Sequence, residues 1–343
     1  MKTKYDQITC AYGAGILLHH IQAFQDEIVG ALEMKDIEPI HQLRVYSRRI
    51  RAALPLFKPC FPKKAASEWQ RQMKKITKTL AQARDLDVQI EFLDQFDQGM
   101  PEQKLHAGIR RLKMRLQQKR NTVQTKVARA LSKLNEDNTL VEMEDFLEPL
   151  KPGEEEKTTS ISSGLYKLAE KTITKKLRNF LAYEDCIMHP DMVAELHKMR
   201  IAAKQLRYTM EVFAPIYTSK LKTPLQTLKK TQDYLGMIHD CDVWGQFLPQ
   251  FYEKERQRTI DYYGNAGPFN FLHPGLEYFQ QDRMKARQEY YEKFVNDWIG
   301  WKADDVWGDL ARSIQIPSLP RDAIIPIEVN IGDQEGEPGC ESD

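Results

Sequence analysis

Hydrophobic residues recur at every third or fourth position along most of the chain, which is the spacing of one face of an α-helix. In the first part of the sequence, four stretches follow this pattern and are separated by glycine or proline. We therefore predict helices over residues 11–34, 39–59, 64–97 and 102–135. The alternation of apolar and polar residues that indicates β-strands is nearly absent.

The same plan restarts after an acidic interruption. Residues 136–160 are rich in Asp, Glu and Pro, so we expect a linker there, either without regular structure or with one short helix. Helical spacing then returns over residues 161–186, 190–215, 220–260 and 276–301. Each half has the size of an up-and-down four-helix bundle. The sequence thus predicts an all-α protein with a first bundle over residues 1–135 and a second over residues 161–303.

One short segment occurs twice, once in each predicted bundle, at a constant offset of 156 residues. Its basic side chains fall at positions i, i+3, i+7 and i+10, which places them within roughly 80° of one another on a helix. Each copy therefore forms a row of positive charge about 15 Å long. We call these rows the two basic stripes, and their members are His41, Arg44, Arg48 and Arg51 in the first and His197, Arg200, Lys204 and Arg207 in the second.

A second repeated segment follows each stripe. Both copies contain Lys-Lys, then Leu, then Asp-x-Asp-Val, with the aspartates at Asp85 and Asp87 in the first and at Asp240 and Asp242 in the second. The offset here is 155 residues, so the repeat shifts by a single residue between the two segments. A repeat of this length indicates an internal duplication. Two duplicated bundles are expected to be related by a pseudo-twofold axis, which would allow their equivalent surfaces to face each other.

A row of positive charge repels itself unless water, internal carboxylates or a bound anion neutralise it. Inorganic polyphosphate suits the stripes best, because it is a flexible, densely anionic chain whose oxygens match arginine forks and lysine ammonium groups. Nucleic acid suits them less well, since Tyr46 and Tyr208 are single instances and no stacking platform is interleaved with the basic residues. Internal ion pairs would explain one stripe, but the repetition in both halves favours an anionic ligand.

The repeated Asp-x-Asp motif allows two interpretations. Paired carboxylates can hold Mg²⁺, but residues i and i+2 of a helix point about 200° apart and do not easily reach one ion. His239 precedes Asp240 as in metal-dependent phosphohydrolases, whereas the equivalent residue of the first half is Arg84, which is not a metal ligand. We therefore predict no metal and no cofactor, and we expect Asp85 and Asp240 to anchor stripe residues through salt bridges.

Charge is distributed unevenly along the chain. The net charge is +1, but residues 322–343 contain seven acidic residues and neither lysine nor arginine, which leaves +8 on residues 1–321. We therefore interpret residues 304–343 as an acidic, disordered tail. A second interpretation is that this tail competes with anions for the basic surface.

Cysteine usage and hydropathy indicate a compartment. The five cysteines are scattered and form no Cys-x-x-Cys pair, which is typical of reduced thiols in a cytosolic protein and gives no zinc site. No apolar run approaches the ~18 residues of a membrane span. No apolar segment follows the N-terminus as it does in a secretory signal. We expect a cytoplasmic protein without membrane association.

The repeated motifs resemble those of the CHAD family, the conserved histidine α-helical domain. In the first half the resemblance is carried by His41-Gln-Leu-Arg44-Val, Arg48-Arg49-Ile-Arg51, Phe57 and Leu80-Ala-Gln-Ala-Arg84-Asp85-Leu-Asp87-Val88. In the second half it is carried by His197-Lys-Met-Arg200-Ile, Lys204, Leu206-Arg207-Tyr208, Glu211, Phe213, Leu235-Gly236 and Asp240. The match extends over most of residues 10–300. Ala81 and Gln205 depart from the family pattern, which has glycine and arginine at these positions.

The resemblance implies two pseudo-symmetric four-helix bundles with a basic cleft or pore between them. It also implies binding of inorganic polyphosphate and association with polyphosphate granules. The family's basic positions correspond to the eight stripe residues, and three further lysines fall where the family often has arginine or lysine, namely Lys74, Lys78 and Lys229. The family is often fused to a CYTH triphosphatase domain, whose glutamate-rich strands are absent here, so the chain resembles a stand-alone member.

From the residues and the resemblance together we expect a non-enzymatic polyphosphate-binding protein, whose other partners are proteins of polyphosphate granules. One alternative is an enzyme or accessory factor that acts on condensed phosphates, with Asp85 and Asp240 holding a metal ion. Another alternative is a nucleic-acid binder, which the lack of stacking residues makes less favoured.

Overall fold

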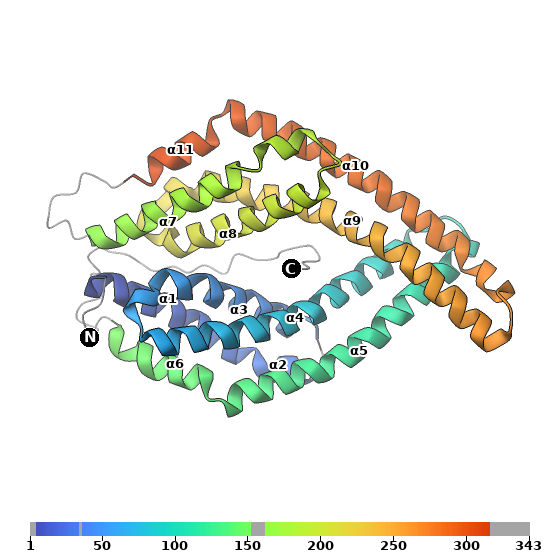
Figure 1. Ribbon diagram of the computed structural model, residues 1–343, viewed down its shortest axis with the longest axis horizontal. Coiled ribbons are helices and arrows are strands. Elements are labelled where there is room, and N and C mark those ends of the chain that lie inside the picture. Colours follow the sequence, from blue (N-terminus) through green and yellow to red (C-terminus); the bar gives the residue numbers. More distant parts are fainter. Residues whose placement is uncertain (1–4, 34–35, 152–161, 316–343) are drawn as a thin grey trace.

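The computed structural model describes residues 5–33, 36–151 and 162–315, and all regular structure within these ranges is helical (Figure 1). The helices before residue 152 are α1 (Gln7–Asp26), α2 (Ile28–Glu33), α3 (Glu38–Phe57), α4 (Lys63–Gln98), α5 (His106–Glu136) and α6 (Thr139–Leu147). Those after residue 161 are α7 (Ser163–Leu181), α8 (Val193–Tyr217), α9 (Lys222–Tyr263), α10 (His273–Ala303) and α11 (Val306–Ser313). The predicted all-α class is confirmed. In the described ranges, no helix combines the length and the apolar character that crossing a membrane requires.

Local sequence explains where the helices begin and which face they bury. Asp6 caps α1, because its carboxylate accepts a hydrogen bond of 2.8 Å from the backbone N–H of Thr9. In α3, Pro39 lies in the first turn, where a backbone N–H would make no hydrogen bond within the helix, so its absence costs nothing. The apolar residues that α3 buries recur at helical spacing and include Leu43, Ile50, Leu54 and Phe57.

Two boundaries differ from the sequence prediction. The helix expected over residues 11–34 is interrupted, since α1 ends at Asp26 and α2 begins at Ile28. Within the expected linker over residues 136–160, α6 is the short helix that the sequence left open, and it buries Leu140, Met143 and Leu147. The linker residues from 152 onward lie outside the described residues.

The prediction of a disordered tail from residue 304 is wrong for the part that the structure describes, which ends at residue 315. Residues 306–313 form α11, and its Val306, Trp307 and Leu310 are buried. The Trp307 ring packs against Phe180 and Trp298, with centroid distances of 5.2 and 5.7 Å. Burial of these apolar side chains on one face stabilises α11. The charged residues around them made the helical pattern hard to recognise in the sequence. The acidic residues from 322 onward lie outside the described part of the chain.

The two halves pack their helices in the same order. In the first half α3 packs against α1 and α4, and α4 packs against α5; in the second half α8 packs against α7 and α9, and α9 packs against α10. Figure 1 shows the long hairpins α4–α5 and α9–α10 extending toward the same end of the molecule. Equivalent neighbours are what an internal duplication requires, while the pseudo-twofold axis itself stays a prediction.

The halves touch at both ends of these hairpins. At one end α3 packs against α8, and the rings of Phe57 and Phe213, which are equivalent in the repeat, have centroids 6.1 Å apart. At the other end α5 packs against α10. A Cβ atom on Gly275 would lie 1.9 Å from the carbonyl oxygen of Leu105, so only glycine allows this close approach of backbones.

Cys10 of α1 and Cys60, which follows α3, form a disulfide bond, so the expectation of reduced thiols is wrong for this pair. The two cysteines are 50 positions apart in the sequence, but packing of α1 against α3 brings their Cα atoms to 5.4 Å. Structural disulfides are rare in reducing compartments, which weighs against the expected cytoplasmic location. Cys186 and Cys241 are buried free thiols. Cys340 lies outside the described residues.

We predict that Cys10 and Cys60 resist alkylation when the chain is denatured without reductant. Iodoacetamide should label Cys186 and Cys241 under these conditions, and it should label Cys10 and Cys60 only after a reductant is added. Mass spectrometry of the digested, alkylated chain measures this for each peptide. Labelling of Cys10 in the absence of reductant would contradict the disulfide.

Candidate functional site

The two basic stripes lie on α3 and α8, which are the helices that join the halves at one end. Half of the stripe side chains are buried despite their charge, with exposed fractions of 6% for His41, 4% for Arg44, 1% for Arg200 and 7% for Lys204. The remaining members are half-buried, and these are Arg48, Arg51, His197 and Arg207. Burying a cation is costly unless anionic or polar groups surround it. The stripes are therefore a site of concentrated, partly desolvated positive charge.

Tyr208 links the two stripes. The guanidinium carbon of Arg48, from the first stripe, lies 4.8 Å from the centroid of the Tyr208 ring. The guanidinium carbon of Arg207, from the second stripe, lies 5.4 Å from the same centroid. Both distances are within the range of cation–π attraction. The sequence analysis treated Tyr208 only as an isolated aromatic residue, although its place directly after Arg207 was a signal that it borders the stripe.

His197 contacts a second histidine that the sequence analysis did not select. The Nδ1 atoms of His197 and His239 are 3.2 Å apart, and the ring centroids are 4.4 Å apart. His239 lies on α9 and directly precedes Asp240. The repeat gave no signal for His239, because the equivalent residue in the first half is Arg84.

Asp85 lies beside the first stripe. Its carboxylate is 4.0 Å from the Nη2 atom of Arg44, and its side chain is 21% exposed. An ion pair of this kind is what an anchoring role of Asp85 requires, and the role itself stays a prediction. Asp240 borders a hollow of about 260 Å³ that is also lined by Arg84 and Arg283.

The second aspartate of each Asp-x-Asp motif bonds to the next long helix of its own half, which is α5 for Asp87 and α10 for Asp242. Arg120 of α5 donates a hydrogen bond of 2.6 Å to Asp87, and Arg287 of α10 donates one of 2.5 Å to Asp242. Burial raises the pKa of both carboxyl groups, and the guanidinium groups oppose that rise. The two acids of each motif therefore have different surroundings, as the 200° angular separation on a helix requires.

No cluster that could hold a metal ion is formed by the His, Cys, Asp and Glu side chains of the described residues. The further lysines expected from the resemblance, Lys74 and Lys78 on α4 and Lys229 on α9, are exposed. Hydrogen bonds and ion pairs among the described residues do not join these three lysines to the stripes. Their assignment to the site stays a prediction.

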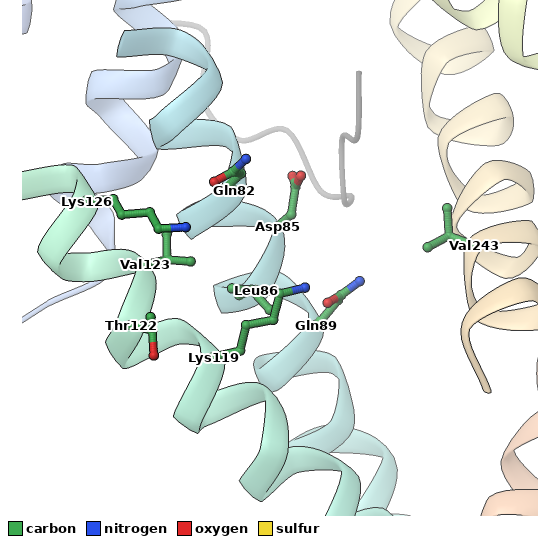
Figure 2. A pocket seen from close by; sticks show the side chains of 9 residues that line it. All are labelled: Gln82, Asp85, Leu86, Gln89, Lys119, Thr122, Val123, Lys126 and Val243. Atoms are coloured by element: carbon green, nitrogen blue, oxygen red, sulfur yellow. The ribbon is translucent and has the colours of Figure 1, made fainter. Parts of the chain in front are cut away.

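A hollow of about 480 Å³ opens between the long helices (Figure 2). Its walls come from both halves: α4 supplies Gln82, Asp85 and Gln89, α5 supplies Lys119 and Lys126, and α9 supplies Val243. Figure 2 shows Lys119 reaching from α5 toward Gln89 of α4, with Val243 on the opposite side. Since Asp85 borders this hollow and also contacts Arg44, the hollow adjoins the first stripe.

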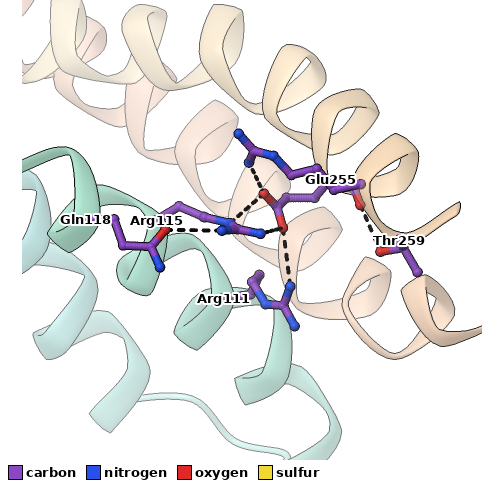
Figure 3. A network of polar contacts seen from close by, with 6 residues as sticks. Arg111, Arg115, Gln118, Glu255 and Thr259 are labelled. Atoms are coloured by element: carbon purple, nitrogen blue, oxygen red, sulfur yellow. Dashed lines mark hydrogen bonds and ion pairs between the residues drawn. The ribbon is translucent and has the colours of Figure 1, made fainter. Parts of the chain in front are cut away.

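A carboxylate farther along the hairpins ties the two halves together (Figure 3). Glu255 of α9 has a fully buried side chain, and it accepts hydrogen bonds from Arg115 Nε (2.7 Å), Arg111 Nη1 (3.3 Å) and Arg258. Arg111 and Arg115 belong to α5. Burial raises the pKa of Glu255, but the hydrogen bonds from Arg115 and Arg258 outweigh it and hold the pKa below its ordinary value.

Replacement of Glu255 by glutamine is expected to lower the free energy of unfolding by about 1–3 kcal/mol at neutral pH, because charged hydrogen bonds are lost at a buried group. A carboxyl group with a lowered folded pKa stabilises the protein above its ordinary pKa, and this contribution is lost as the pH falls through the folded value. The difference between wild type and Glu255→Gln should therefore shrink below the ordinary value of 4.5. Urea unfolding at several pH values measures it, with the exposed neighbour Glu253→Gln as control. A difference that persists at low pH would contradict the assignment.

Comparison with known proteins adds to this geometry. The family model of the CHAD domain matches residues 15–249. The crystal structure of the CHAD domain from the plant Ricinus communis has 20% sequence identity and a TM-score of 0.57, over 91% of this chain and 92% of that chain. PptA from Streptomyces chartreusis has 17% identity and a TM-score of 0.54, over 84% of this chain and 98% of that chain. A comparison with curated proteins found no match.

The two solved structures have low sequence identity, so they support the fold alone. The family match is more informative, because residues 15–249 include both basic stripes and both Asp-x-Asp motifs. It also covers the helices α3 and α8, through which the halves join. The chain therefore belongs to the CHAD domain family.

Proposed function

We propose that this protein binds inorganic polyphosphate through the two basic stripes and leaves the polyphosphate chain chemically unchanged. The observation that carries the proposal is the convergence of the stripes. Arg48 of one half and Arg207 of the other lie against the same Tyr208 ring, so two rows of cations from distant parts of the sequence meet in one place. A flexible anionic chain is a ligand that can contact both rows at once.

The chemistry of the stripes suits phosphate oxygens. Arginine presents a planar fork that can grip two oxygens of one phosphate, and lysine adds a mobile point charge. Arg44 and Arg200 are nearly fully buried, and charge interactions are stronger in such surroundings than in open water. Association with polyphosphate granules, and with the proteins there, would follow from the same affinity and belongs to the proposal.

Nucleic acid is a weaker candidate, because proteins bind single-stranded nucleic acid largely by stacking its bases on aromatic side chains. The ring nearest to both stripes is Tyr208, and the guanidinium groups of Arg48 and Arg207 already lie against it. Tyr46 is buried, with 9% of its surface exposed. Arginine side chains therefore compete with a base for Tyr208, and Tyr46 is largely withdrawn from solvent.

Catalysis by a metal ion on the Asp-x-Asp motifs is the other alternative. It would need more than one carboxylate of each motif near the same phosphate. Asp87 and Asp242 are instead bonded to Arg120 of α5 and Arg287 of α10. This division of partners favours a binding role for the site.

Calorimetric titration of the full chain with long-chain polyphosphate tests the proposal. We expect saturable binding, no release of orthophosphate when Mg²⁺ is added, and poor competition by single-stranded RNA. Phosphate release that depends on Mg²⁺ and on Asp85 would support the enzyme instead. Displacement of polyphosphate by equimolar RNA would support the nucleic-acid binder.

A further inference from the structure

The basic face of α5 is not accounted for by the stripes. Two hollows lie against this face, one of about 480 Å³ and one of about 430 Å³, and they share Lys119 and Thr122 as lining residues. We call the combined hollow the lateral groove. Its basic residues are Arg115, Lys119 and Lys126 from α5 and Lys254 and Arg258 from α9.

Positive charge dominates the lateral groove. Among the described residues that line the groove, only Asp85 is acidic, and it lies at the end nearest the first stripe. Arg115 and Arg258 share the buried carboxylate of Glu255 behind the groove wall. Lys119, Lys126 and Lys254 are exposed, and no hydrogen bond or ion pair within the described ranges neutralises them. These three ammonium groups are therefore available to an anion.

The groove adjoins the first stripe at Asp85. Asp85 lines the groove and lies 4.0 Å from Arg44. From Lys126 to Arg115 the groove follows α5 over three helical turns, which is about 16 Å at the rise of an α-helix. An anion held on the stripes and long enough to pass Asp85 would enter the groove next to Lys126 and Lys119.

The neutral lining also suits phosphate. The side chains of Gln82, Gln89, Gln118 and Thr122 carry amide or hydroxyl donors for phosphate oxygens. The aromatic residue most open to the groove is Phe247, whose ring packs against Trp244 and Phe251 with centroid distances of 5.8 Å in both cases. The groove thus offers charge and hydrogen-bond donors in preference to stacking surfaces.

We propose that the lateral groove is a second segment of the anion site, which takes the continuation of a long polyphosphate chain after the stripes are filled. The inference rests on the proposed function, and it adds a basis for chain-length preference. A short polyphosphate occupies the stripes alone, whereas a long one also neutralises Lys119, Lys126 and Lys254.

The test compares two charge-matched triple variants of the full chain. The groove variant carries Lys119→Gln, Lys126→Gln and Lys254→Gln. The control variant carries Lys167→Gln, Lys171→Gln and Lys175→Gln, which are exposed lysines of α7 that line neither hollow. Both are titrated with long-chain polyphosphate and with tripolyphosphate at several salt concentrations, and their melting temperatures confirm that they fold like the wild type.

For long-chain polyphosphate we expect the groove variant to bind at least tenfold more weakly than the control variant. The slope of log affinity against log salt should fall by about 2, since each lost phosphate contact removes about 0.7. Tripolyphosphate affinity should differ less than twofold between the variants. Equal affinities of the two variants for the long chain, or an equal loss for tripolyphosphate, would overturn the groove. Failure of wild type to bind long-chain polyphosphate at low salt would instead reject the proposed function, and the groove with it.

Discussion

Replacement of Arg44 and Arg200 by glutamine in one variant is expected to weaken binding of long-chain polyphosphate at least a hundredfold. The two residues are equivalent members of the stripes, and they are the most buried arginines in them, with exposed fractions of 4% and 1%. A hydrogen bond to a charged group contributes about 1.5–3 kcal/mol, so loss of one such contact in each half removes about 3–6 kcal/mol. Calorimetric titration at low salt measures the change.

The matched control for this variant carries Arg129→Gln and Arg256→Gln. Both arginines are exposed and lie outside the stripes and the lateral groove. If the buried substitutions disturb folding, Arg51→Gln with Arg207→Gln provides a second variant, because these stripe members are only half-buried. Wild-type affinity in folded forms of both stripe variants would show that polyphosphate does not bind to the stripes.

Replacement of Asp87 by alanine is expected to lower the free energy of unfolding by about 3–5 kcal/mol, which is the usual cost of removing one partner from a buried ion pair. The side chains of Asp87 and Arg120 are 5% and 10% exposed, and the Oδ1 atom of Asp87 lies 2.6 Å from the Nε atom of Arg120. The variant leaves the Arg120 guanidinium buried without its carboxylate. Urea unfolding followed by circular dichroism measures the loss.

Two companion variants separate this mechanism from a general effect of mutation. Glu91→Ala removes an exposed acid from the same helix and should change the free energy of unfolding by less than about 0.5 kcal/mol. Arg120→Met added to Asp87→Ala should recover much of the loss, because an apolar replacement of a whole buried ion pair is often neutral. If Asp87→Ala is as stable as wild type, the second aspartate of the motif is not structural.

The helices and the stripes could be predicted from the sequence because both are local. Helical spacing fixes which face of α3 is apolar, and the same spacing aligns His41, Arg44, Arg48 and Arg51 on one side. The angle between Asp85 and Asp87 also follows from helix geometry alone. It predicts that the two carboxylates have different partners, and the structure places Asp85 beside Arg44 and Asp87 beside Arg120. Spacing could not identify Arg120 and Arg287 as the partners of Asp87 and Asp242.

The features that the sequence did not reveal depend on contacts between distant segments. Cys10 and Cys60 meet only because α1 packs against α3. Glu255 lies in a highly charged segment of α9 where nothing distinguishes it from exposed neighbours, and its partners on α5 are 140 or more residues away. The short helix α11 was missed because its few buried residues are anchored by Phe180 and Trp298 of other helices.

The salt dependence of long-chain polyphosphate binding to the wild-type protein reports how many of its cations contact phosphates. If four to eight of the stripe cations contact phosphates, the stripes should contribute between about −3 and −6 to the slope of log affinity against log salt, and the three groove lysines about −2 more. Affinity should then drop at least roughly 50-fold between 50 and 200 mM salt. Absence of binding at 50 mM salt, or a slope shallower than about −1, would contradict the account that the two stripes hold a polyphosphate chain.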